Sequence, residues 1–207
     1  MSSDQRERII KQALTMYMEQ GVKSVRMDDI ARQMHISKRT IYEIFGDKEE
    51  LLYQSVVAHL EELTVEMDKV GYQAPNILVS ILMVSRYITQ SAELTWRLRR
   101  SLQQYYPAIH DRIKSLDTTE RQRIFRERLM VGVEQGLISS AMGVDVLMSM
   151  MHYVSTAIAE HDIRFAIPEG LTREQAFRAA HITMLRGVST PKGMEVIDEY
   201  LKETLKN

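Results

Sequence analysis

Residues that break helices are scarce in this chain, which has only 4 prolines and 9 glycines among 207 residues. Apolar residues recur at intervals of three and four over most of its length, which is the spacing of one face of a helix. Alternating patterns typical of strands are nearly absent, and no internal repeat of roughly 20 to 50 residues stands out. The chain is therefore predicted to be all-α and long enough to bury a sizeable core.

Apolar spacing, glycines and capping residues set the expected helix ends. Ser37 is a good N-cap, Asp47 with Glu50 forms a pattern like a capping box, and Thr172 with Gln175 forms a second one. The expected helices are 4–20, 26–34, 38–45, a long helix from 48 to about 70, then 77–90, 93–104, 107–135 with a break near 116, 144–160, 173–188 and a last amphipathic helix near the C-terminus.

Composition restricts the classes of partner and compartment. The formal net charge is −1, with 27% charged residues, so any attraction to nucleic acid must be local. The absence of cysteine excludes disulfides and thiolate metal sites and favours a reducing compartment. The N-terminal MSSDQRERII lacks the apolar core of a signal peptide, and no apolar run reaches the roughly 18 residues of a membrane span. We expect a soluble cytoplasmic protein without a membrane partner.

Two short helices separated by a tight turn, residues 26–34 and 38–45, follow a longer first helix. This arrangement is typical of a helix-turn-helix module, whose second short helix enters the major groove of DNA. Such a helix needs an apolar inner face and an outer face that reaches bases and phosphates. The inner face is supplied by Ile41, Ile44 and Phe45, and the outer face by Lys38, Arg39, Thr40, Tyr42 and Glu43.

The placement of charge around this helix favours DNA. No acidic residue occurs from Ile30 to Tyr42, whereas Arg32, Lys38 and Arg39 are basic, so a locally positive face is predicted. Lys48, beside free backbone N–H groups at the start of the next helix, suits a phosphate. A Lys-Arg pair on a short helix is by itself usually a solvated face. The ordered series of helix, turn, cap and basic helix favours the DNA-binding interpretation.

The stretch MDDIARQMHISKRTIYEIFGDKEELL resembles the DNA-binding signature of the TetR family of bacterial transcriptional regulators. The resemblance is close over residues 6–56 and architectural beyond them, although VEQGLISSAMGVD, residues 133–145, is similar to a glycine-containing loop of many members. The positions that match the family pattern are Ile30, Ala31, Ser37, Thr40, Ile41, Tyr42, Phe45, Lys48 and Leu51.

The resemblance implies two domains, a three-helix helix-turn-helix DNA-binding domain at residues 1–48 and, joined by a long helix, a helical-bundle domain for dimerisation and ligand binding at 49–207. It implies double-stranded DNA with a palindromic operator as a partner. The DNA-binding residues that it indicates are Arg26, Ser37, Lys38, Arg39, Thr40, Tyr42 and Lys48. Arg39 is the first choice for base readout, because arginine paired to guanine is the commonest specific contact.

Arg26 stands where the family commonly has a threonine that caps the second helix and contacts a phosphate. Its role is either a longer-range phosphate contact or that of a solvated arginine. Met27 and His35 are interpreted as packing and turn residues.

The C-terminal helices offer broad apolar faces. One helix carries Val146, Leu147, Met150, Met151, Val154, Ala157 and Ile158, and another carries Ala176, Phe177, Ala180, Met184 and Leu185. Either an intrachain core or a dimer interface explains these faces, and the resemblance favours a homodimer.

The 14 methionines indicate an adaptable interior. Residues in the region of the family's small-molecule pocket are Met83, Trp96, Tyr105, Phe125 and Met130, although such side chains at helical spacing are more often plain core. Residues 97–128 carry nine Lys/Arg against four Asp/Glu, which suits an acidic ligand, a second DNA contact or a solvated face.

The function implied by the resemblance is sequence-specific transcriptional regulation, with repression relieved by a small-molecule effector. Activation stays open, as does the alternative of a helical regulator or interaction module without a ligand that acts through a protein partner. An enzyme finds little support, since the chain has no cysteine, no HExxH motif and no glycine-rich phosphate loop. No catalytic residue, metal site or cofactor is expected.

Overall fold

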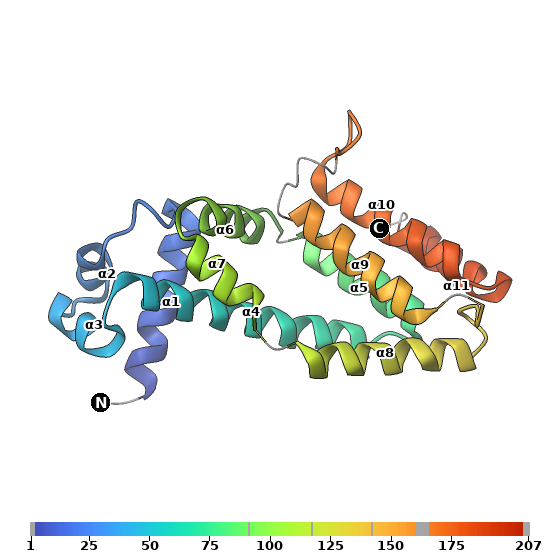
Figure 1. Ribbon diagram of the computed structural model, residues 1–207, viewed down its shortest axis with the longest axis horizontal. Coiled ribbons are helices and arrows are strands. Elements are labelled where there is room, and N and C mark those ends of the chain that lie inside the picture. The colour runs from blue at the N-terminus through green and yellow to red at the C-terminus, as the bar shows by residue number, and fades with distance from the viewer. Residues whose placement is uncertain (1–2, 91, 117, 142, 160–165, 205–207) are drawn as a thin grey trace. The chain divides into compact units, whose positions relative to one another are not determined.

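The computed structural model describes residues 3–90, 92–116, 118–141, 143–159 and 166–204. Within these ranges the chain forms eleven helices and no strand, apart from an isolated bridge between Ile138 and Ser189 (Figure 1). The prediction of an all-α fold is confirmed. The helices are α1 (Ser3–Gln20), α2 (Met27–Met34), α3 (Lys38–Phe45), α4 (Lys48–Tyr72), α5 (Ile77–Gln90), α6 (Ala92–Tyr105), α7 (Pro107–Lys114), α8 (Thr119–Glu134), α9 (Val144–Ala159), α10 (Arg173–Val188) and α11 (Pro191–Thr204).

Local capping explains where several helices begin. The Ser37 hydroxyl accepts a hydrogen bond from the Thr40 N–H at 3.1 Å, and the Asp47 carboxylate accepts one from the Glu50 N–H at 2.8 Å. Each bond satisfies a backbone donor that has no partner inside the helix. The break predicted near residue 116 is also present, because α7 ends at Lys114 and α8 begins at Thr119.

The chain divides into two compact units. The first unit comprises residues 1–65 with 93–116, and the second comprises residues 66–92 with 117–207. Helix α4 begins in the first unit and ends in the second. The predicted boundary between a DNA-binding domain at residues 1–48 and a C-terminal domain at 49–207 stays a prediction.

One apolar core holds the first unit together, and α6 and α7 contribute to it as well as α1 to α4. Leu98, Leu102 and Ile109 lie in the same buried cluster as residues of the helix-turn-helix. The other fully or almost fully buried members are Ile9, Ala13, Met16, Tyr17, Val22, Val25, Met27, Ile30, Ala31, Ile41, Phe45, Leu51, Leu52 and Val56. The short helices α2 and α3 therefore derive their stability from a core to which six helices contribute, since eight-residue helices are marginal alone.

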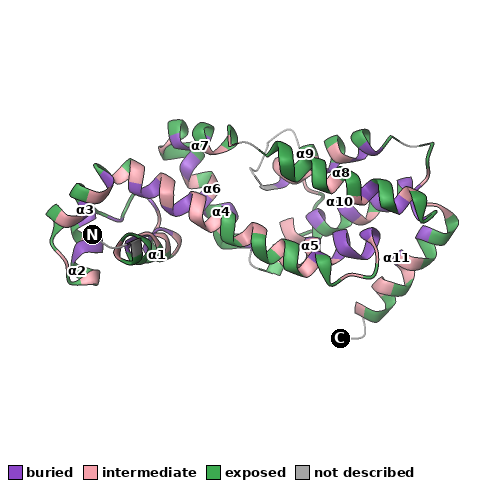
Figure 2. Ribbon diagram, turned by 90° about the horizontal axis from the view of Figure 1, so that it is seen from below, coloured by how far each residue is buried: buried purple, intermediate pink, exposed green. Residues whose placement is uncertain are grey.

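The second unit is built around α5, which packs against α10 and α11 and also contacts α8. Helix α9 packs against both α8 and α10. Helices of this unit carry the buried positions marked in Figure 2, and its core includes Leu78 on α5, Leu129 on α8, Leu185 on α10, Ile197 on α11 and Ile138 after α8. None of the helices in the described ranges is sufficiently long and apolar to cross a membrane.

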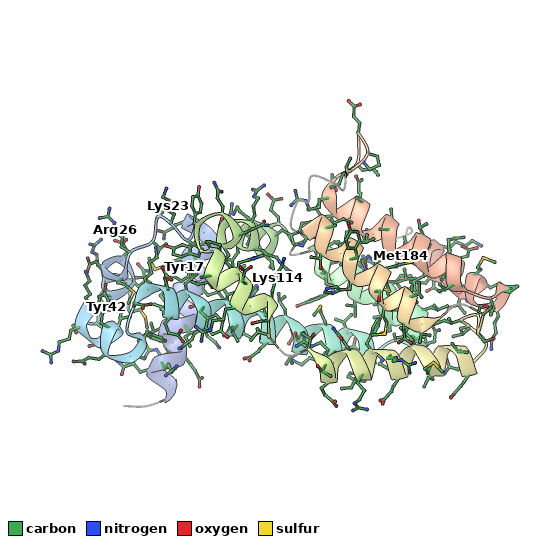
Figure 3. The ribbon with its side chains drawn as sticks, viewed as in Figure 1. Tyr17, Lys23, Arg26, Tyr42, Lys114 and Met184 are labelled. Atoms are coloured by element: carbon green, nitrogen blue, oxygen red, sulfur yellow. The ribbon has the colours of Figure 1, made fainter. Side chains whose placement is uncertain are left out.

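Tyr17 is a buried polar residue in the first unit (Figure 3), with 1% of its surface exposed. Its hydroxyl finds no hydrogen-bond partner among the described residues. Burial raises the pKa of Tyr17 above its usual value, and the nearby Tyr106 adds to the effect. A buried hydroxyl without a partner loses its bonds to water and gains nothing in return.

We expect Tyr17→Phe to raise the free energy of unfolding by about 1 kcal/mol at neutral pH. The phenol ionises near pH 10 in the unfolded chain but at higher pH in the folded one, so the wild-type protein loses stability as the pH rises above about 10. The phenylalanine variant lacks this loss. Denaturant unfolding of both proteins at pH 7 and pH 10.5 measures the two effects, and a less stable variant at pH 7 would show that the hydroxyl is satisfied.

Candidate nucleic-acid interface

Helix α2 begins after Arg26, whose extended backbone (φ −109°, ψ 158°) places it at the N-cap. Its N–H donates to the Asp29 carboxylate at 3.0 Å, which is half of a capping box. The arginine side chain has no acceptor with which to complete the box. It is exposed and extends away from α2 in Figure 3, so it is available to a partner.

The turn between α2 and α3 depends on His35, the one non-glycine residue of the described chain with positive φ, at 56°. Its N–H bonds to the Arg32 carbonyl at 3.2 Å, and the Ile36 N–H bonds to the Ala31 carbonyl at 3.0 Å. These bonds close the end of α2 and turn the chain toward Ser37. His35 is thus a turn residue, as the sequence predicts.

Helix α3 has the two faces that the sequence predicts. Ile41 is fully buried and Phe45 is 4% exposed, and both join the core of the first unit. Lys38, Arg39 and Tyr42 are exposed on the other side, and Thr40 is half-buried. The Thr40 hydroxyl also shares a 2.8 Å hydrogen bond with that of Ser37. The structure therefore brings Ser37, Lys38, Arg39, Thr40 and Tyr42 together at one short helix.

The sequence predicts a positive face here, because the stretch from Ile30 to Tyr42 has no acidic residue. In the structure, however, two acidic residues from outside that stretch lie beside the cations. Lys38 Nζ donates to Asp28 Oδ2 at 3.0 Å, and Arg39 Nε donates to Glu43 Oε1 at 2.7 Å. The hydrogen bond with Asp28 raises the pKa of Lys38. The pairing of Lys38 with Asp28 could not be predicted from the sequence, because it depends on how α2 packs against α3.

Lys48 is half-buried, unlike the other cations of the interface. Its Nζ donates to the Val22 carbonyl at 2.7 Å and lies 5.7 Å from the centre of the Tyr106 ring. The ammonium thus ties the start of α4 to the loop between α1 and α2. A lysine has three N–H donors, so one tie leaves others for a phosphate.

Helices α6 and α7 bring further basic residues to the first unit. Arg97 donates to the Met18 carbonyl, and Arg112 donates to Glu50 at 2.7 Å while lying 3.5 Å from the centre of the Tyr53 ring. The pKa of Glu50 is lowered by its hydrogen bonds with Gln54 and Arg112. No local signal in the sequence shows that residues 93–116 pack with the DNA-binding helices.

The five residues predicted to line an effector pocket fall into both units. Trp96, 6% exposed, and Tyr105, 43% exposed, belong to the first unit. Met83 and Phe125 are half-buried in the second unit, where Met130 is 37% exposed. The structure does not group them within a single unit, and the pocket stays a prediction.

No cluster of three or more His, Asp or Glu residues suited to a metal ion occurs in the part of the chain that the structure describes.

Known proteins share both the sequence pattern of the helix-turn-helix and the fold of the chain. Residues 9–54, which include α2, the turn and α3, match the family model of "Bacterial regulatory proteins, tetR family". No curated protein showed significant sequence similarity.

Solved structures share the fold of almost the whole chain. A protein described as a TetR-family transcriptional regulator from Mesorhizobium loti has a TM-score of 0.68 at 18% identity, over 92% of this chain and 100% of that one. The TetR-family regulator PfmR from Thermus thermophilus has a TM-score of 0.56 at 22% identity, over 86% and 97%. The fatty acid degradation regulator FadR from Bacillus halodurans has a TM-score of 0.65 at 14% identity, over 90% and 97%.

A family-specific match covers the helix-turn-helix, and the shared fold extends through the remaining helices. Residues 9–54 of this protein are thus similar to the tetR family of bacterial regulatory proteins, and the chain has the fold of solved TetR-family regulators.

Proposed function

We propose that the protein is a repressor that binds a palindromic operator as a homodimer and leaves it when a small molecule binds to the C-terminal helices. The observation that carries the DNA-binding part is helix α3, with Ile41 and Phe45 buried and Lys38, Arg39 and Tyr42 exposed. Such a helix presents one row of polar side chains to a groove while its other side is fixed.

The proposed contacts follow from the reach and donors of each side chain. Arg39 reads a base, because a guanidinium can donate two parallel hydrogen bonds to guanine. Lys38 contacts a base edge or a nearby phosphate, and Thr40 and Tyr42 contact phosphates or a thymine methyl group. Ser37 fixes the start of the helix beside the DNA backbone. Arg26, at the N-cap of α2, and Lys48, at the start of α4, contact phosphates at the edges of the groove.

The homodimer is supported by the outer face of α9. Val146, Met150 and Tyr153 are 57%, 51% and 60% exposed, and their spacing of four and three residues puts them on one side of the helix. An exposed small residue, Ala179, lies on the neighbouring α10. An exposed apolar helix face of this kind suits close packing against a second copy of this chain.

Release by an effector is supported by the composition of the second unit, where Met83, Phe125 and Met130 supply adaptable apolar side chains. The chemical class of the effector is open. Coupling requires a ligand that prefers one of two states, with a typical coupling energy of about 1–3 kcal/mol.

Selection of bound duplexes from a random-sequence library tests the base-reading role of Arg39. We expect wild-type protein to enrich an inverted repeat, and Arg39→Ala to bind that sequence about 10 to 100 times more weakly with a relaxed preference at one base pair of each half-site. Thermal unfolding of both proteins serves as the folding control. An unchanged preference in the Arg39→Ala variant would contradict this assignment.

A further inference from the structure

Each cation of the recognition helix α3 is paired with a carboxylate, and the proposed DNA contacts give these two carboxylates no role. Lys38 Nζ lies 3.0 Å from Asp28 Oδ2, with the two side chains 48% and 52% exposed. Arg39 Nε lies 2.7 Å from Glu43 Oε1, with the two side chains 88% and 53% exposed. Both pairs are open to solvent on the face that the proposed function turns to DNA.

Ion pairs this exposed add little to the stability of a fold, because water screens them and ordering the side chains costs entropy. The larger effect of these ion pairs is on how readily Lys38 and Arg39 bind phosphate. A phosphate that approaches Lys38 or Arg39 must compete with a carboxylate already in place, and the carboxylate repels the phosphate as well. The local attraction for an arbitrary stretch of DNA backbone is therefore weakened.

The two pairs still leave hydrogen-bonding capacity for a specific target. Glu43 accepts from Nε alone, so the terminal amino groups of Arg39 have no partner among the described residues. These groups can donate to the edge of a guanine while Glu43 restrains the rotation of the guanidinium. Lys38 is held between Asp28 and the Tyr42 ring, whose centre is 5.7 Å from Nζ. The hydrogen bond that raises the pKa of Lys38 is consistent with a formed pair.

We infer that Asp28 and Glu43 are positioning residues that set sequence discrimination, by restraining Lys38 and Arg39 and by lowering affinity for DNA of arbitrary sequence. This inference rests on the proposed function, since it needs α3 to read DNA. It extends that function by giving two acidic residues a part in specificity.

The test uses three variants that each remove one negative charge with little change of shape. Asp28→Asn and Glu43→Gln act at the interface. Glu62→Gln is the matched control, because Glu62 is 60% exposed and paired with Lys11 at 3.9 Å. Glu62 also lies on α4 roughly 20 Å along the helix from Lys48, at about 1.5 Å per residue.

Fluorescence anisotropy at fixed salt measures the Kd of each protein for the duplex that wild type selects and for a scrambled duplex. We expect Asp28→Asn and Glu43→Gln each to tighten binding to the scrambled duplex by about tenfold and to change binding to the selected duplex by less than about threefold. The ratio of the two affinities then falls by several-fold. Glu62→Gln is expected to leave the ratio at the wild-type value.

A double-mutant cycle shows whether Glu43 acts through Arg39. Glu43→Ala removes the hydrogen-bond acceptor that glutamine would keep, so we expect it to weaken binding to the selected duplex about fivefold more than Glu43→Gln does. In an Arg39→Ala background the same change is expected to have no effect on the selected duplex. An equal effect with and without Arg39 would show that Glu43 acts on DNA directly and would overturn its positioning role.

The outcomes separate this inference from the proposed function. If wild type discriminates strongly and both interface variants keep its ratio, the inference is wrong while the proposed function stands. The same holds if the interface variants and Glu62→Gln alter the ratio alike. If wild type binds every duplex equally, the proposed function fails and the inference fails with it. Thermal unfolding of every variant confirms that the proteins compared are folded.

Discussion

Replacing Gly193 with alanine is expected to lower the free energy of unfolding of the second unit by about 3 kcal/mol. A Cβ at this position would lie well under 3.0 Å from the Leu137 carbonyl oxygen, which is closer than real Cβ atoms come. Because this oxygen belongs to the backbone, it cannot move aside by a change of side-chain rotamer. The Leu137 carbonyl is also held, because it accepts a hydrogen bond from the Thr190 N–H at 3.0 Å. Relief of the overlap therefore requires α11 to move.

Gly187→Ala is the matched control for this substitution. Gly187 is also helical, but it is exposed and a Cβ added there meets no atom within 4 Å. Alanine is favoured over glycine inside a helix by up to about 1 kcal/mol, so the control is expected to be neutral or stabilising. Denaturant unfolding of the full chain, followed by circular dichroism, compares the two. Equal stability of Gly193→Ala and wild type would contradict the close packing of α11 against the loop at Leu137.

Replacing Met150 with arginine is expected to convert the proposed homodimer to monomers and to weaken operator binding by at least about 100-fold. Met150 lies in the middle of the exposed apolar row on α9, where a charge would be buried without a partner in the dimer. The loss of DNA affinity follows because two linked half-sites gain about 10²- to 10⁴-fold over one. Light scattering after gel filtration measures the mass, and anisotropy measures the Kd.

Val131→Arg is the control for Met150→Arg. Val131 on α8 is 47% exposed, close to the 51% of Met150, but it lies outside the proposed interface. We expect this variant to remain a dimer with unchanged affinity for the operator. A Met150→Arg protein that stays dimeric and binds normally would show that the face of α9 is not the interface.

The helix-turn-helix could be predicted from the sequence because its signals are local. Ser37, Gly46 and Asp47 set the ends of α3 and the start of α4, and the structure contains each cap or turn. The break between α7 and α8 is likewise visible in the chain near residue 116. Short-range hydrogen bonding decides these features, so a single sequence is sufficient to predict them.

Features that depend on long-range packing could not be predicted. Nothing near Leu98, Leu102 or Ile109 in sequence indicates that they join the core of the DNA-binding helices. The same is true of the bond from Lys48 to the Val22 carbonyl and of the pair between Lys38 and Asp28. Each depends on where one helix lies against another, which local patterns do not specify.

Sequence-specific recognition by α3 is tested most directly by the affinity of purified wild-type protein for the duplex that it selects from a random library, against a scrambled duplex of equal length at stated salt. We expect the selected duplex to be an inverted repeat whose half-sites lie about one helical turn apart, bound at least about 1,000-fold more tightly than the scrambled duplex. Equal affinity for the two duplexes would contradict sequence-specific recognition by α3.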